Sequence, residues 1–96
     1  MPFVKGNNHA QKVAHDVPPE FRLYFRRLGA AIRLYRQSKG LRLGTYSISF
    51  ATATAIETGT QRSIRFATYL AMAKDLGIAP SQLLKMSEDM VIPGYE

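Results

Sequence analysis

The stretch Ile48–Gly59, ISFATATAIETG, predicts a short helix with a defined start and end. Ser49 is a favourable N-cap, and glycine is the residue that most often ends a helix in the left-handed conformation. Ala53 and Ile56 stand three residues apart, which places them on one face. Threonine is a weak helix former, so packing against the rest of the chain must hold this helix in place.

A long basic helix is predicted before this stretch, over residues 19–39. Apolar side chains recur there at intervals of three and four and form one stripe, and arginines occupy most of the other face. The stripe consists of Phe21, Tyr24 or Phe25, Leu28, Ala31 or Ile32, and Tyr35. Gly40 ends the helix. The segment LRLGTYS, residues 41–47, is compatible with either a short helix or a strand.

Two more helices are predicted after the opening stretch. The first begins at a capping Ser63 and ends at Gly77. Its apolar stripe consists of Phe66, Tyr69 or Leu70, Ala73 and Leu76. The second is short and has Pro80 in its first turn. The sequence therefore predicts an all-α, compact five-helix domain, in which the second helix would be the short segment 41–47.

The chain divides into three regions around this domain. Residues 1–18 contain a Gly-Asn-Asn cluster and no sustained periodicity, so we expect a flexible N-terminal arm. Lys5 and Lys12 would allow that arm to wrap a duplex, although a disordered arm without contacts is the simpler expectation. Residues 19–86 form the domain, and residues 87–96 form an acidic tail.

The composition excludes several kinds of site. The 96 residues contain no cysteine, which excludes a disulfide framework, a cysteine-ligated zinc and a thiol nucleophile. His9 and His15 lie in the first fifteen residues without a carboxylate cluster, so we expect no metal and no cofactor. The domain also lacks a close pair of acids for acid–base catalysis, so we do not expect an enzyme. No apolar run approaches the ~18 residues of a membrane span, and we expect a soluble, cytoplasmic protein.

Positive charge is concentrated between residues 20 and 66. This segment holds nine arginines and lysines, eight of them arginine, against two acids, so its net charge is +7, and the remainder of the chain carries −1. Such an asymmetry is typical of a protein that binds a polyanion. Arginine suits two-point contacts with phosphate, so the composition favours nucleic acid as the partner.

The helix order resembles the lambda-repressor-like helix-turn-helix family (XRE type), which includes the phage repressors and Cro. LGAAIRLYRQSKGL, residues 28–41, looks like the first helix of that family, and ISFATATAIETG is similar to its recognition helix. YLAMAKDLGIAPSQLL, residues 69–84, looks like its fourth and fifth helices. The resemblance implies a transcriptional regulator, repressor or activator, that binds double-stranded DNA as a homodimer and places residues 49–58 in the major groove. The apolar residues offered for dimerisation are Leu83, Leu84, Met86, Met90, Val91 and Ile92.

The resemblance also implies roles for individual residues. The residues that would face the bases are Phe50, Ala51, Thr52, Thr54 and Ala55. The residues that would lie near phosphates are Arg42, Thr45, Ser49, Thr60, Gln61, Arg62, Ser63 and Arg65. Arg36 and Glu57 match a salt bridge between the first and third helices. The base-facing set cannot form two-point contacts with guanine or adenine but can contact thymine methyl groups, so we expect an A·T-leaning site.

The chain departs from the family pattern in ways that leave alternatives open. The family has about four more residues between Leu41 and Ile48, close to one helical turn, so the resemblance implies a shortened second helix. Phe50 could then fill the gap that the missing turn leaves, instead of facing the bases. In a second register, residues 60–70 would enter the groove, with Arg62 and Arg65 on guanines. An alternative function is a helix-turn-helix-fold protein-interaction module, an antiactivator or adaptor with weak or no base readout.

Overall fold

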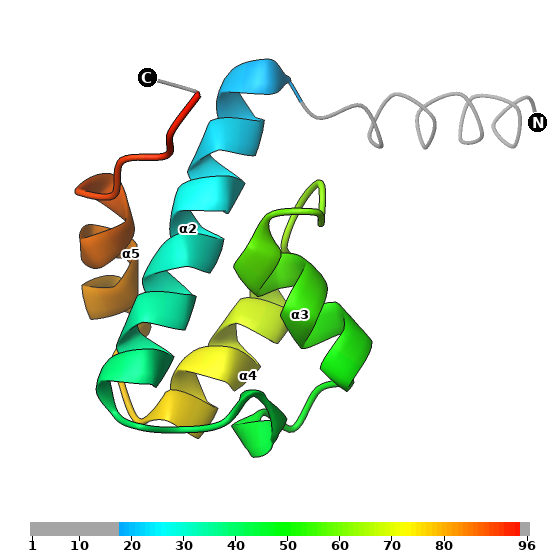
Figure 1. Cartoon of the computed structure of the whole chain (residues 1–96), viewed down its shortest axis with the longest axis vertical. Helices are drawn as coiled ribbons and strands as arrows, with labels where there is room; N and C mark the ends of the chain where they lie inside the picture. The colour runs from blue at the N-terminus through cyan, green and yellow to red at the C-terminus, as the bar shows by residue number, and fades with distance from the viewer. Residues whose placement is uncertain (1–17, 95–96) are drawn as a thin grey trace, which may run out of the picture.

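The computed structural model describes residues 18–94, and this part of the chain forms four α-helices, one 3-10 helix and no strand (Figure 1). In chain order the elements are α2 (Pro19–Ser38), η1 (Leu43–Thr45), α3 (Phe50–Thr58), α4 (Phe66–Leu76) and α5 (Pro80–Glu88). Helix α2 contacts all three other α-helices, and in Figure 1 α5 and α3 lie on opposite sides of it. The described chain is therefore all-α, as predicted. The predicted N-terminal arm lies almost entirely outside the described residues.

The second predicted helix is replaced by a single 3-10 turn, Leu43–Thr45, which corrects the expectation of five helices. Glycine and β-branched threonine, at positions 44 and 45, disfavour a continued α-helix. The backbone is extended on both sides, at Arg42 (φ −85°, ψ 161°) and at Tyr46 (φ −74°, ψ 145°). The extended residue Tyr46 has its ring in the core, only 6% exposed.

The helix ends follow the predicted signals except at the start of α4. Gly40, Gly59 and Gly77 all have positive φ and follow α2, α3 and α4. Helix α4 begins at Phe66, however, and Ser63 does not cap it. Ile64 packs against the core from the preceding loop. A helix continued back to Ser63 would carry Ile64, at 100° per residue, to the side opposite the buried stripe of α4.

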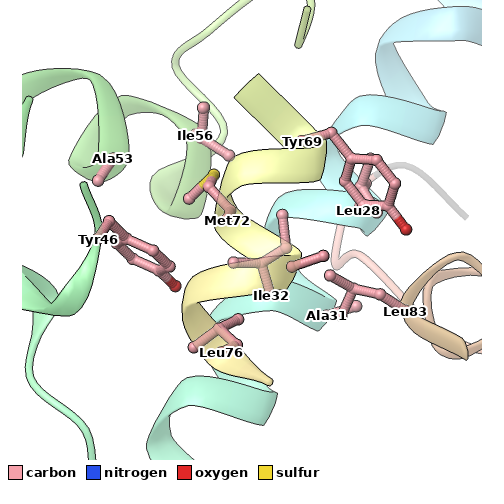
Figure 2. Packing of buried hydrophobic residues seen from close by; sticks show 11 residues of the cluster. Leu28, Ala31, Ile32, Tyr46, Ala53, Ile56, Tyr69, Met72, Leu76 and Leu83 are labelled. Atoms are coloured by element: carbon pink, nitrogen blue, oxygen red, sulfur yellow. The ribbon is translucent and has the colours of Figure 1, made fainter. Parts of the chain in front are cut away.

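One core joins the four α-helices (Figure 2). The largest fully buried side chains are Ile32, Ile56, Met72 and Leu83, one from each α-helix. The Tyr69 hydroxyl donates a hydrogen bond to the carbonyl of Pro80, which links α4 to the start of α5.

Four residues named for the predicted stripes are exposed instead of buried, namely Phe21, Tyr24, Phe66 and Leu70. Helix α2 has 20 residues, whereas the other three α-helices have 9 to 11. The first turns of α2 therefore extend past its neighbours, and the aromatic side chains of those turns are not covered. Phe66 is the first residue of α4 and precedes the buried Tyr69 by one turn.

Gly29 allows α2 and α3 to touch through their backbones. A Cβ atom placed on Gly29 would lie 2.0 Å from the carbonyl oxygen of Ile56 and 3.1 Å from its carbonyl carbon. Real atoms do not approach so closely, and the obstacle is backbone that cannot rotate away. A side chain at this position would therefore separate α3 from α2.

We expect Gly29→Ala to lower the free energy of unfolding by about 2 kcal/mol, because overpacking outweighs the better helix propensity of alanine. Urea unfolding followed by circular dichroism measures the change. Gly44→Ala is the matched control, since a Cβ atom there meets nothing within 4 Å. Equal stability of Gly29→Ala and the parent protein would contradict this close helix crossing.

Candidate nucleic-acid interface

Glu57 and Arg36 form a two-point ion pair that holds α3 against α2. Arg36 Nε donates to Glu57 Oε2 at 2.8 Å, and Arg36 Nη2 donates to Glu57 Oε1 at 2.9 Å. The two side chains are 12% and 3% exposed. Arg36 Nη1 also donates to the carbonyl oxygen of Leu41 at 2.7 Å. The guanidinium group therefore joins the end of α2, the turn that follows it, and α3.

Tyr46 completes this network. Its hydroxyl donates to Glu57 Oε2 at 2.6 Å, and its ring lies in the same cluster as Ala53 of α3 (Figure 2). Burial, together with the hydrogen bond to Glu57, raises the pKa of Tyr46, so its hydroxyl keeps its proton. The hydrogen bond with Glu57 raises the pKa of Arg36 against the opposing effect of burial. Sequence reasoning missed Tyr46, because an ambiguous short segment gave no sign of which side chain would turn inward.

The loop that leads into α3 is tied to α4. The Ser47 amide and hydroxyl both donate to Asp75 Oδ2, at 2.7 and 2.9 Å. Ser49 then caps α3 by accepting a hydrogen bond from the amide of Thr52 at 3.1 Å, as predicted. The start of α3 is thus anchored through Ser47 and Asp75, and its end through Glu57.

A row of arginines on α2 follows the crossing with α3. Intervals of four and three residues alternate along this row, which places its members on one side of the helix. The row consists of Arg22, Arg26, Gly29, Arg33 and Arg36. Since Gly29 touches α3, this side faces α3. Arg26 Nη1 donates to the carbonyl of Gly59 at 3.1 Å, at the helix C-terminus, where cations are favoured. Arg26 and Arg36 therefore hold α3 in place, and of these two only Arg36 was expected to do so.

The other two arginines of the row are exposed and border hollows beside α3. Arg33 lines a hollow of about 150 Å³ with Thr54 and Thr58 of α3. Arg22 lines another, of about 170 Å³, together with the segment 59–62. The α2 row therefore supplies two cations next to α3 in addition to its two structural arginines.

The five predicted base-facing residues lie away from the core. Phe50 and Ala51 are exposed, and Thr52, Thr54 and Ala55 are half-buried. Thr58, which sequence reasoning missed, is also exposed, and its spacing of four from Thr54 puts it on the same side of α3.

The threonine hydroxyls on α3 take part in local hydrogen bonds. Thr54 Oγ1 donates to the carbonyl of Phe50 at 2.8 Å, and Thr58 Oγ1 donates to the carbonyl of Thr54 at 2.7 Å. Thr52 Oγ1 accepts from the Ser49 hydroxyl at 2.8 Å. The donors of Thr54 and Thr58 are thus directed at the backbone of their own helix.

The packing role considered for Phe50 is contradicted. Its side chain is 64% exposed, whereas Tyr46 is buried against the inner side of α3. Tyr46 therefore packs in the core beside α3, and the Phe50 ring lies at the surface at the start of this helix.

The predicted phosphate-facing residues are nearly all accessible. The exposed members are Arg42, Ser49, Thr60, Gln61, Arg62, Ser63 and Arg65, and Thr45 is half-buried. The backbone amides of Thr60 and Gln61 donate to the carbonyl of Ala55, at 2.9 and 3.2 Å. These two amides are thus occupied in ending α3, so the contacts of Thr60 and Gln61 with phosphate would have to come from their side chains.

Exposed arginines border both sides of α3. Arg65 lines a hollow of about 310 Å³ with Thr52 of α3 and Thr68 of α4. Arg33 lies on the α2 side, as described above, and Arg42 is the exposed residue directly before η1. Among residues 18–94 the exposed acids are Glu20, Glu88 and Asp89. They lie in the first turn of α2 and at the end of α5, so no exposed acid belongs to η1, α3 or the 59–65 loop.

The second register is contradicted by the start of α4. Residues 60–65 form a loop, and Arg65 is the extended residue (φ −66°, ψ 143°) before the helix. Arg62 and Arg65 are therefore not on a helix that could enter a groove.

Residues 18–94 contain neither a candidate metal-binding group nor a candidate membrane-spanning helix. No group of three or more histidine, cysteine, aspartate or glutamate side chains is placed to hold a metal ion there. None of the helices in this range combines the length and apolar character needed to cross a membrane. No protein-family model, curated protein or solved structure matches the chain.

We expect Arg36→Ala to lower the free energy of unfolding by about 3 kcal/mol, because it leaves the buried carboxylate of Glu57 without its cation. Arg33→Ala, on the same row of α2 but exposed, is the matched control and should change stability by less than about 0.5 kcal/mol. Urea unfolding of both variants makes the comparison. A similar effect of the two substitutions would show that the ion pair does not stabilise the helix junction.

Proposed function

We propose that the protein is a sequence-specific DNA-binding transcriptional regulator, related to the lambda-repressor-like helix-turn-helix proteins, which places α3 in the major groove. The observation that carries this proposal is the position of exposed arginines on both sides of α3. Arg33 lines a hollow on the α2 side of α3, and Arg65 lines one on the α4 side. The major groove is about 12 Å wide, admits one helix, and is bordered by phosphates on both edges. Cations at both flanks of a helix match that arrangement.

The side chains of α3 itself suit close approach to a groove. Its outer residues are small apart from Phe50, and its single charged residue, Glu57, points inward to Arg36. Affinity would therefore come from the flanking arginines, which displace counterions from the phosphates. In this proposal η1 takes the place of the second helix of the family, and the Tyr46–Glu57 hydrogen bond supports α3 in place of the missing turn.

We expect Arg33→Ala and Arg65→Ala each to weaken duplex binding and to reduce the slope of log affinity against log salt concentration by about 0.9. Selection from a random duplex pool at two salt concentrations, followed by sequencing, provides the bound sequence for the titrations. Lys85→Ala removes an exposed cation from α5 and should leave the slope unchanged. Equal slopes for all three variants would contradict the proposed orientation of α3.

A second candidate function is a protein-interaction module, an antiactivator or adaptor with the same fold. The exposed rings of Phe50 and Phe66 favour it, because aromatic side chains are enriched in protein interfaces. Absence of duplex binding at low salt would support this candidate and refute the DNA-binding proposal.

The regulator would act as a homodimer on paired half-sites. Four of the six apolar residues that the sequence offered for dimerisation pack on or in the core instead: Leu83, Met86, Met90 and Ile92. Leu84 and Val91 are exposed. Leu84 lines an apolar hollow of about 280 Å³ together with Phe21 and Tyr24 from the first turns of α2. This surface lies on the α5 side of α2, away from α3, so a second copy bound here would leave α3 accessible (Figure 1).

We expect Leu84→Glu to shift the protein toward monomer in sedimentation equilibrium and to weaken binding to two half-sites more than to one. Burial of a carboxylate opposite Phe21 and Tyr24 of a second copy would be unfavourable. Leu34→Glu is the matched control, because Leu34 of α2 is similarly exposed but does not line this hollow. A monomeric parent protein would refute this dimer.

A further inference from the structure

We propose that the outer side of α3 recognises the C5-methyl group of pyrimidines in the major groove, in thymine and in 5-methylcytosine alike. This inference rests on the proposed function and concerns how the same helix distinguishes one sequence from another. It follows from which groups α3 presents and from which of its polar groups are already occupied.

Two of the three threonine hydroxyls of α3, those of Thr54 and Thr58, are turned toward the backbone of the helix. Thr54 and Thr58 each donate to the carbonyl four residues earlier, at 2.8 and 2.7 Å. A threonine in that rotamer keeps its oxygen against the preceding turn and its γ-methyl group on another side of Cβ, away from that carbonyl. Thr58 is exposed and Thr54 is half-buried, and neither belongs to the core. We therefore infer that their methyl groups form part of the outer surface of α3.

Apart from Thr52, whose hydroxyl oxygen accepts a hydrogen bond from the Ser49 hydroxyl, the remaining outer residues of α3 are apolar. Ala51 is exposed, Ala55 is half-buried, and the ring of Phe50 is 64% exposed at the first residue of the helix. The only charged side chain of the helix, Glu57, is buried in its ion pair with Arg36. No residue of α3 can therefore form the two-point hydrogen bonds by which arginine, asparagine or glutamine distinguish purines.

The C5-methyl group is the apolar feature that the major-groove edge offers to such a surface. Thymine and 5-methylcytosine carry it at the same ring position, whereas uracil and cytosine lack it. A helix that presents methyl groups and a phenyl ring should thus favour methylated pyrimidines. Cytosine methylation would then increase binding where it restores a methyl group at a contacted position.

The test uses the full chain and the duplex selected from the random pool. Each thymine of the half-site is replaced in turn by deoxyuridine, which removes only the methyl group. We expect affinity to fall about fourfold at each contacted thymine, the effect of losing one buried methyl contact. Replacing such a T·A pair by C·G should weaken binding, and 5-methyldeoxycytidine at that position should recover part of the loss.

Two substitutions at Thr54 separate the methyl group from the hydroxyl. Thr54→Ser keeps the hydroxyl and its backbone hydrogen bond but lacks the methyl group, so it should lose discrimination against deoxyuridine at one position. Thr54→Val keeps a methyl group and should retain the discrimination. A merely structural role of Thr54 would change affinity for the thymine and deoxyuridine duplexes equally, and that result would overturn the inference.

The outcomes also distinguish this inference from the function on which it rests. An enriched half-site whose affinity is insensitive to deoxyuridine at every thymine would overturn methyl recognition and leave DNA binding intact. A protein that binds no duplex at low salt would overturn the proposed function, and the inference with it.

Discussion

The carboxylate of Glu57 lies where three segments of the chain meet. It accepts two hydrogen bonds from Arg36 of α2 and one from Tyr46, which follows η1, and it belongs to α3 itself. A buried carboxylate is costly unless its oxygens are paired, so this position demands both partners at once. The Arg36 side chain in turn donates to the carbonyl of Leu41, which fixes the turn after α2. This polar junction therefore adds to the packing of Ala53 and Ile56, the two apolar residues that α3 contributes to the core.

The close crossing at Gly29 and the arginine row have a common consequence. Contact between the backbones of α2 and α3 brings the neighbouring residues of α2 within reach of α3. Arg26 and Arg36, on either side of the crossing, bind Gly59 and Glu57. The same geometry leaves other arginines of the row exposed beside α3. Some of the arginines between residues 20 and 66 thus bind groups of the protein itself. The net charge of this segment therefore overstates the number of cations that could bind a polyanion.

The parts of the fold that depend on local chemistry were predictable from the sequence. The N-cap at Ser49 and the glycines that follow three helices are local signals, and the structure has them where the sequence placed them. The Arg36–Glu57 ion pair was expected only through a family resemblance. Neither local signals nor the resemblance identified the roles of Tyr46, Asp75 and Gly29. Each of these residues contacts a part of the chain that is distant in the sequence.

The exposed aromatic residues show a second limit of sequence periodicity. Phe21 and Tyr24 continue the apolar stripe of α2, yet they are exposed because the neighbouring helices are too short to cover them. A periodic pattern identifies the apolar side of a helix, but it does not show how far along that side the neighbouring helices pack. The regular spacing of the α2 arginines was equally visible, but its meaning depends on knowing that Gly29 faces α3.

Under the proposed function, the apolar outer side of α3 explains why a second copy would be needed. Contacts with methyl groups contribute about 0.8 kcal/mol each, less than the ~1–3 kcal/mol of a two-point hydrogen-bonded pair. A few such contacts cannot distinguish one site from the ~10⁶–10⁹ competing sites of a genome. Two half-sites at a fixed spacing add their discrimination, and the spacing itself excludes most chance matches. Because each α3 would distinguish base sequences only weakly, its position in the subunit must be fixed by the Glu57 network, and the two subunits must associate at a defined spacing.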